Sequence, residues 1–191
     1  MLAQIATGTI SPTTWIAIAI AVILILAIVW YATRKRRSEH LRKQFGPEYD
    51  RYVRTIGSQS KAEEDLAARE RRHRKLDIKP LAPDARQRYQ DEWRKLQSEF
   101  VDAPEAAIRK ADTLIQSVMR DRGYPTGDFD RQTEDLSVDH SRVLDDYRSA
   151  HEISERSVNG SASTEELRQA VISYRSLFDS LVGTQAVTGE R

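Results

Sequence analysis

Histidine and carboxylate side chains are the groups in this sequence that could support acid–base or metal chemistry. There are four histidines, and no two of them have the His-x-x-x-His spacing that places two ligands on one helix face. Asp139 could orient His140 as a base, but the spacing places no nucleophile beside this pair. His151 falls on the apolar side of a predicted helix, which favours a hydrogen-bonded core histidine. A site assembled from His140, His151 and nearby carboxylates is retained as an alternative.

Composition excludes other kinds of chemistry. The chain has no cysteine, which excludes disulfides, thiolate catalysis and zinc–thiolate sites. Its 8 glycines include no G-x-G or G-K-[ST] arrangement, so no loop for binding a nucleotide phosphate is expected. We therefore predict a protein that is not an enzyme and that uses no cofactor or metal.

The strongest local cluster of charge could contact anions. Its cations are Arg69, Arg71, Arg72, Arg74 and Lys75. Phosphates of lipid or nucleic acid would suit these side chains, but no aromatic side chains are interleaved for base stacking. Lipid headgroups, or acidic side chains of the same chain, are therefore favoured over nucleic acid. A solvated helix face is the alternative without a ligand.

An apolar segment precedes this cluster. Residues 15–32 are 18 consecutive positions without a charged side chain, and a helix of about 20 residues crosses a bilayer. Aromatic rings at both ends and cations at the second end are typical of membrane interfaces. The interface residues that we predict are Trp15, Trp30, Tyr31, Arg34, Lys35, Arg36 and Arg37. The positive-inside rule then places the N-terminus outside and the C-terminal domain in the cytoplasm.

Two alternatives for the apolar segment are disfavoured. A cleaved signal peptide should begin with basic residues and end at small ones, but residues 1–14 are uncharged and Trp30 and Tyr31 precede Ala32. A buried core helix should have a polar face, and this segment has none.

The remaining segments predict helices separated by turns. Gly46-Pro47, Gly57, the two prolines of residues 79–83, Gly123-Tyr124-Pro125 and Asn159-Gly160 end or separate them. Capping boxes are predicted at Ser60, Asp102 and Ser163, each with a glutamate three positions later. The helix over residues 61–75 carries few apolar side chains, so its packing is left open. Trp93, Phe100, Tyr174 and Phe178 are predicted core residues.

We therefore predict an all-α protein with one N-terminal transmembrane helix followed by a soluble antiparallel helical bundle. The expected parts are a short extracytoplasmic tail (1–11), the transmembrane helix (12–33), a basic juxtamembrane segment and linker (34–83), the bundle (84–182) and a flexible tail (183–191).

Four segments resemble a family of short bacterial single-pass membrane proteins that has no assigned function. They are FGPEYDR at residues 45–51, RGYP at 122–125, Phe100-Val101-Asp102 and TEELR at 164–168. The two turn-rich segments, FGPEYDR and RGYP, favour sharp chain reversals. A role as partner-binding loops is the alternative. The resemblance implies a location in the bacterial inner membrane and supplies no activity, cofactor or site residue.

Charge is distributed unevenly along the chain. Residues 34–88 carry 17 Lys and Arg against 9 Asp and Glu, whereas residues 89–191 carry 13 against 20. The basic part is thus expected to face something anionic. The function that we predict is protein–protein interaction or scaffolding at the cytoplasmic face of the inner membrane, with a protein partner or a second copy. Anionic-lipid or nucleic-acid binding through the basic segment is the alternative.

Overall fold

The computed structural model describes residues 12–183 and forms two compact units, one ending at His40 and the other beginning at Leu41. The side chains at positions 12–14, 16, 17 and 19 lie outside this description. So does the predicted tail over residues 1–11, and so does the predicted tail over residues 183–191 apart from Gly183.

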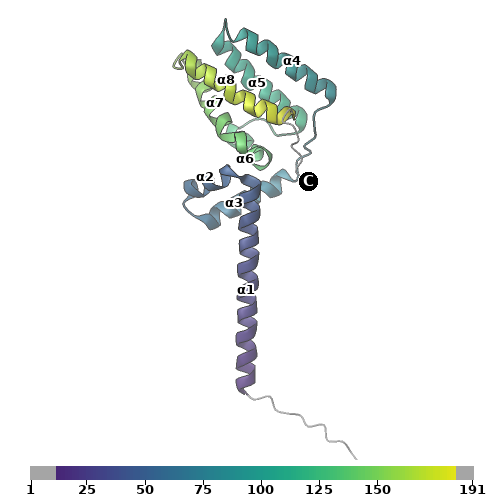
Figure 1. Cartoon of the computed structure of the whole chain (residues 1–191), viewed down its shortest axis with the longest axis vertical. Helices are drawn as coiled ribbons and strands as arrows, with labels where there is room; N and C mark the ends of the chain where they lie inside the picture. Colours follow the sequence, from purple (N-terminus) through teal and green to yellow (C-terminus); the bar gives the residue numbers. More distant parts are fainter. Residues whose placement is uncertain (1–11, 184–191) are drawn as a thin grey trace, which may run out of the picture. The chain divides into compact units, whose positions relative to one another are not determined.

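Every element that the described residues form is helical, which confirms the all-α prediction (Figure 1). The helices are α1 (Pro12–Phe45), α2 (Pro47–Ile56), α3 (Gln59–His73), α4 (Pro83–Glu99), α5 (Pro104–Arg122), α6 (Phe129–Asp139), the 3-10 turn η1 (Ser141–Val143), α7 (Leu144–Val158) and α8 (Thr164–Val182).

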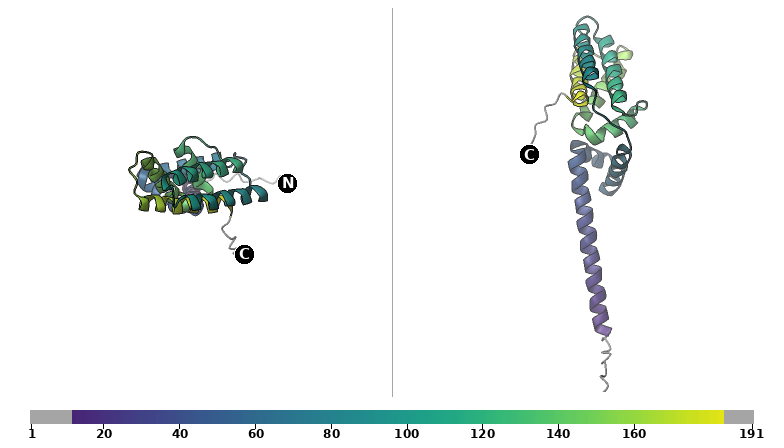
Figure 2. Two further views of the ribbon diagram at one scale, coloured as in Figure 1. Left: turned by 90° about the horizontal axis from the view of Figure 1, so that it is seen from above. Right: turned by 90° about the vertical axis from the view of Figure 1, so that its right-hand side faces the viewer.

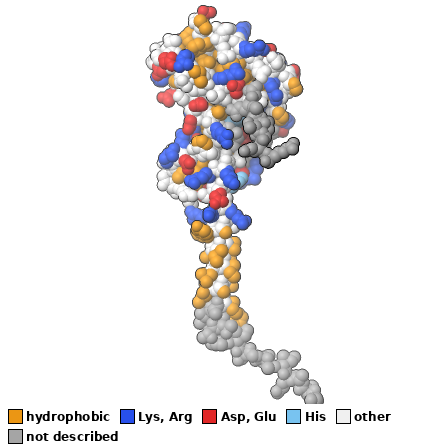
Figure 3. All heavy atoms as spheres, in the orientation of Figure 1, with side chains coloured by type: hydrophobic (Ala, Val, Ile, Leu, Met, Phe, Trp, Pro, Cys, Tyr) orange, Lys and Arg blue, Asp and Glu red, His pale blue; other side chains and the backbone are white. Residues whose placement is uncertain are grey.

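The first unit consists of the greater part of α1. Its large apolar side chains with described positions are all exposed, from Trp15 to Tyr31, and Figure 3 shows them along the helix. Over the part of the chain that is described, no helix is long and apolar enough to count as a candidate membrane span. The transmembrane part of the predicted fold class is therefore not supported by these helices.

The second unit contains the predicted helical bundle. Helices α4, α5, α7 and α8 pack against one another (Figures 1 and 2). The indole of Trp93 on α4 stacks on Phe178 of α8 at 4.7 Å between ring centroids, and both rings are fully buried. Tyr174 is also fully buried, whereas Phe100 is partly buried at the edge of this core. Aromatic packing of this kind supplies much of the burial that stabilises a helical domain.

A second, smaller apolar cluster lies apart from the bundle core. It joins the last turns of α1 to α2 and α3, with one side chain from α6. Its buried members are Leu41, Phe45, Tyr49, Leu66, Ala67 and Val138. The helix whose packing the sequence left open, α3, therefore buries its narrow apolar face in this cluster. The basic segment from Leu41 onward belongs to the same compact unit as the bundle, and the division between units lies after His40.

Most predicted turns coincide with helix ends, but only one predicted capping box forms. Ser163 accepts a hydrogen bond from the backbone of Glu166, whose side chain accepts one in return from the backbone of Ser163. The predicted box at Asp102 is wrong, because Pro104 occupies the first helical position and makes Ala103 the N-cap. The predicted box at Ser60 is also wrong, because α3 begins at Gln59, two residues earlier than predicted, and Ser58 is its N-cap.

Candidate functional site

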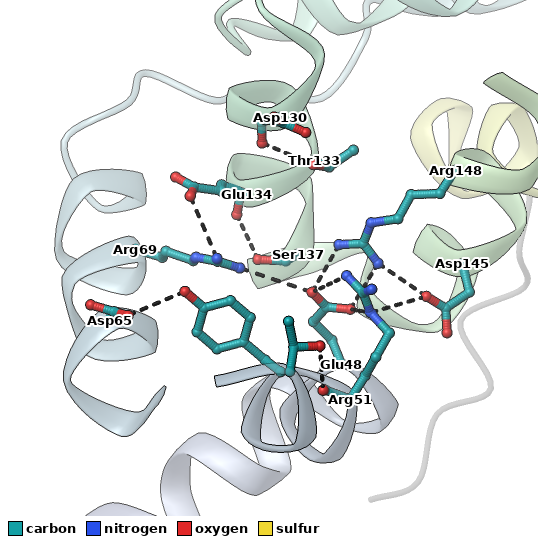
Figure 4. Close-up of polar contacts among 12 residues, drawn as sticks. Glu48, Arg51, Asp65, Arg69, Asp130, Thr133, Glu134, Ser137, Asp145 and Arg148 are labelled. Carbon is teal, nitrogen blue, oxygen red and sulfur yellow. Dashed lines mark hydrogen bonds and ion pairs between the residues drawn. The ribbon is translucent and has the colours of Figure 1, made fainter. Parts of the chain in front are cut away.

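Glu48 is a buried carboxylate in the first turn of α2, with 1% of its surface exposed. Two guanidinium groups bind both of its oxygens (Figure 4). Arg148 of α7 donates to Oε1 at 2.8 Å and to Oε2 at 2.9 Å. Arg51, one turn further along α2, donates to Oε2 at 3.0 Å and to Oε1 at 3.3 Å. Such two-point pairs combine charge attraction with defined geometry.

The arginines keep Glu48 ionised in spite of its burial. Removal from water by itself raises the pKa of this carboxyl group, because a buried charge is poorly solvated. The hydrogen bonds from Arg148 and Arg51 outweigh that effect, so the pKa of Glu48 lies below its ordinary value. Glu48 is thus a fixed negative charge at neutral pH and is unsuited to proton transfer there.

Arg69 of α3 connects this carboxylate to a second one, Glu134 of α6. Its Nη1 lies 3.9 Å from Oε1 of Glu48, and its Nη2 lies 3.5 Å from Oε1 of Glu134. The guanidinium also lies over the ring of Tyr52, 4.2 Å from the ring centroid. Arg72 donates to the other oxygen of Glu134 at 2.5 Å. Four helices, α2, α3, α6 and α7, therefore meet at one network of charges (Figure 4).

The predicted anion-binding cluster is divided between two environments. Arg69 is buried and Arg72 is half-buried, and both bind carboxylates of this chain. Arg71, Arg74 and Lys75 are exposed, and the described part of the chain pairs none of the three with a carboxylate. Internal acidic side chains, one of the predicted ligands, thus bind two of the five cations.

His140 lies at the junction of α6, α5 and α8, with 8% of its surface exposed. Its Nδ1 is 2.7 Å from Oγ of Ser180, and its Nε2 is 3.4 Å from Nη1 of Arg122. A guanidinium can only donate, so Nε2 must be the acceptor and Nδ1 must carry the hydrogen. His140 therefore donates to Ser180 and does not act as a base toward its hydroxyl. Burial, followed by the charge of Arg122, lowers the pKa of His140 to about 4.

Asp139 makes two contacts that fasten α3 and the turn after α5 to the end of α6. Nε2 of His73 lies 3.0 Å from its Oδ2, and the hydroxyl of Tyr124 donates to the same oxygen at 3.0 Å. Burial raises the pKa of Asp139, but the contacts with His73 and Tyr124 outweigh it, and the net pKa is lowered. The Asp139–His140 pair is therefore part of a helix junction.

His151 belongs to a different set of contacts. Its ring stacks on Phe129 at 3.7 Å between centroids and 9° between planes. Its Nδ1 lies 3.7 Å from Oδ1 of Asp112, which is an ion-pair distance and too long for a hydrogen bond. Among the described residues Nδ1 of this histidine has no hydrogen-bond partner, and stacking positions the ring. No contact between His140 and His151 is found in the described residues, so the alternative site that combines them is not assembled.

The two turn-rich segments make close packing contacts. In RGYP, a Cβ on Gly123 would overlap the backbone carbonyl oxygen of Asp77, and its φ of +92° favours glycine. The neighbouring Arg122 donates to the carbonyl oxygen of Leu181 at 2.9 Å. In FGPEYDR, Phe45 and Tyr49 are buried together with Glu48. Both segments thus have the structural role that their composition favours.

The predicted membrane-interface residues all lie on α1. Trp15, Trp30 and Tyr31 are exposed, at 60%, 61% and 66% of their surface. The guanidinium of Arg34 lies 5.3 Å from the ring centroid of Trp30, and Lys35 lies 4.0 Å from Glu39. Arg36 and Arg37 are exposed.

No pattern in the sequence indicates the Glu48–Arg148 pair, whose members are 100 positions apart. The one available signal was a glutamate directly after a helix-starting proline, which is equally typical of an exposed first turn. Its burial depends on helices that come much later in the chain.

The described residues contain no group of His, Asp and Glu side chains that could hold a metal ion. A hollow of about 530 Å³ lies between α4 and α5, with Leu96 and Leu114 among its apolar lining and Lys95, Arg109 and Lys110 among its cations. Comparisons with protein-family models, with curated proteins and with solved structures find no match to this chain. The proposed function below therefore depends on the chain's own residues.

Proposed function

We propose that this protein is a membrane-anchored helical module that binds a protein partner, or a second copy of itself, at the cytoplasmic face of a bacterial inner membrane. The apolar segment of residues 15–32 carries the proposal. Its large side chains with described positions are exposed on α1, and transferring such side chains from water to hydrocarbon is worth about 1.5–3 kcal/mol each. Arg34 to Arg37 support the orientation, because they follow the segment directly.

A partner-binding role is supported by the structural use of the buried ionisable side chains around Glu48 and His140. Glu48 and His140 each hold helices together, and neither presents a reactive group to solvent. The hollow between α4 and α5 offers an apolar floor with charged walls, as protein-interaction grooves do. An anchor would also confine copies and partners to one surface, so that weak contacts become effective.

Membrane attachment is tested by fractionation and labelling. The full chain should remain in the membrane pellet after a carbonate wash and leave it only with detergent. Because there is no native cysteine, single variants Thr7→Cys and Thr126→Cys give unique thiols. An impermeant maleimide should label position 7 in intact spheroplasts and position 126 only after lysis. Recovery of the untruncated chain in the supernatant would refute the anchor.

Partner binding is tested by photo-crosslinking in native membranes. A crosslinker at Thr113, in the hollow between α4 and α5, should give a discrete protein adduct that mass spectrometry identifies as a partner or a second copy. A crosslinker at exposed Thr126 serves as the control. Crosslinkers at several exposed positions that yield only lipid adducts would exclude the interaction role.

A second function, binding of anionic lipid or nucleic acid, is favoured by the exposed cations Arg71, Arg74 and Lys75. Full-length protein in neutral-lipid nanodiscs would be titrated with fluorescent vesicles that contain anionic lipid, and separately with a fluorescent oligonucleotide. Binding should weaken steeply between about 50 and 300 mM salt and be lost when all three cations are changed to glutamine. Absence of binding at low salt would remove this alternative.

A further inference from the structure

We propose that residues 41–73, which comprise the last turns of α1 with α2 and α3, detach from the helical bundle as one body while the bundle stays folded. We call these residues the α2–α3 arm. The surface that joins the arm to the bundle is called the polar joint. On the arm it consists of Gln44, Glu48, Arg51, Arg69, Arg72 and His73, and on the bundle side of Glu134, the carbonyl of Val138, Asp139, Asp145 and Arg148.

The arm has the internal contacts of a separate body. Phe45, Tyr49 and Leu66 belong to its own apolar cluster, which shares no member with the bundle core. The hydroxyl of Tyr49 donates to the buried carboxylate of Glu63 at 2.7 Å, and Gln59 donates to the same oxygen at 2.8 Å. The Tyr49–Glu63 bond joins α2 to α3, the Gln59–Glu63 bond lies within α3, and neither depends on the bundle.

The joint itself is made mainly of charges. Arg148 binds Glu48, Arg51 lies 3.4 Å from Asp145, and Arg72 binds Glu134. The buried apolar contribution from the bundle side to the arm's cluster is one residue, Val138. Charges that separate are rehydrated by water, and for buried ion pairs this hydration approximately balances the attraction that is lost. Opening the joint therefore requires much less free energy than disrupting the bundle core, where apolar surface would meet water.

The chain connection permits this movement. The linker after α3 is fastened to the bundle from residue 77 onward, because the carbonyl oxygen of Asp77 lies against Gly123 and the backbone N–H of Lys79 donates to Arg122 at 2.8 Å. Residues 74–76 lie between His73 and this attachment and form only turns and a bend. They are the hinge about which the arm would move.

Glu48 makes the contacts of the polar joint depend on one another. With 1% of its surface exposed, its charge cannot be left in place without the arginines that solvate it. Loss of Arg148 leaves Arg51 and Arg69 as partial compensation, at 3.0 and 3.9 Å. Such a change therefore shifts the opening equilibrium and does not abolish the fold of either body.

Hydrogen–deuterium exchange of the full chain in lipid nanodiscs tests the proposal. Once detached, the arm is a small body that opens its own helices more readily than the bundle does. Amides of residues 47–73 should therefore exchange through a shared opening that is at least tenfold more frequent than the opening of α5 and α8. Arg148→Met should raise the exchange of residues 47–73 by a further tenfold or more and leave α5 and α8 within twofold of the unchanged protein. Arg168→Met is the matched control, because it removes an arginine that pairs with Glu165 on the surface of α8, and it should change neither.

Glu48→Gln supplies a second variant of nearly the same shape, with the same expected pattern. If both variants fail to fold, the exchange of the unchanged protein decides the question. Equal opening frequencies for residues 47–73 and α8 in that protein would overturn the proposal. So would a variant that accelerates exchange in all helices alike, or one that leaves residues 47–73 unaffected.

Discussion

At the scale of single residues, the ionisable groups of this protein hold helices together. Glu48 is a buried anion held by arginines, and His140 is a buried neutral ring whose two nitrogens already have partners. In both cases the environment selects one protonation state and keeps it at neutral pH. Groups of this kind make stability depend on pH even where no proton is transferred in a reaction.

Acid should destabilise the second unit through His140. The pKa of His140 is about 4 in the folded protein, against 6.5 ordinarily, so the unfolded chain binds a proton first as the pH falls. The free energy of unfolding should therefore be unaffected above pH 7, decrease between about pH 6.5 and 4, and level off below that, with a loss of about 3 kcal/mol from this group. Urea unfolding followed by circular dichroism at several pH values measures it.

The variant His140→Asn keeps a donor for Ser180 and removes the titration, so the decrease over that pH range should become shallower. The control His40→Gln changes an exposed histidine that lies outside the second unit, so it should leave the unfolding of that unit as it was. An unchanged slope in His140→Asn would show that other groups cause the acid sensitivity.

At the scale of elements, glycines and prolines decide where each helix ends, and close backbone packing decides how neighbouring segments meet. Gly46, Gly57 and Gly123 all have positive φ and follow directly after a helix. Gly123 differs from the other two because another backbone segment lies against it. That position therefore has two requirements, one conformational and one steric.

Gly123→Ala should destabilise the second unit by about 2–4 kcal/mol, because the left-handed backbone costs about 1 kcal/mol and the methyl group displaces the Asp77 backbone. Gly160→Ala is the matched control, since its φ is +67° and no atom lies within 4 Å of the new methyl group. Gly160→Ala should lower the free energy of unfolding by about 1 kcal/mol, the cost of the left-handed backbone alone. Thermal unfolding measures both, and equal losses would contradict the steric explanation.

At the scale of the whole molecule, apolar residues serve two purposes. Those of residues 15–32 follow one another without interruption, whereas those of the second unit recur at helical spacing and are buried in two clusters. The second unit accordingly contains everything needed to bury its own apolar surface. It should not need the apolar segment in order to fold.

Residues 34–191, produced alone, should therefore stay in aqueous buffer without detergent and unfold cooperatively. This shorter chain retains one of the three tryptophans, Trp93, which is fully buried against Phe178. Its emission should be blue-shifted in buffer and move to the red in one transition as urea is added. The full chain should precipitate under the same conditions. Aggregation of the shorter chain, or red-shifted emission in buffer, would contradict the prediction.

The sequence by itself determined most of the local structure, because the signals concerned act over a few residues. Proline and glycine positions located the helix ends, helical spacing identified Trp93, Tyr174 and Phe178 as core, and the Ser163 capping box was correct. The family resemblance and the membrane location stay predictions.

Only the tertiary structure decided how the charges are used. Which cations of residues 69–75 are internal depends on whether Glu48 and Glu134 come within reach, and those carboxylates lie on other helices. Helical periodicity shows which face of a helix is apolar, but an arginine looks the same in a sequence whether it faces water or a buried carboxylate. Burial of a charge is determined by the packing of elements that are distant along the chain, and it is this packing that created the network around Glu48.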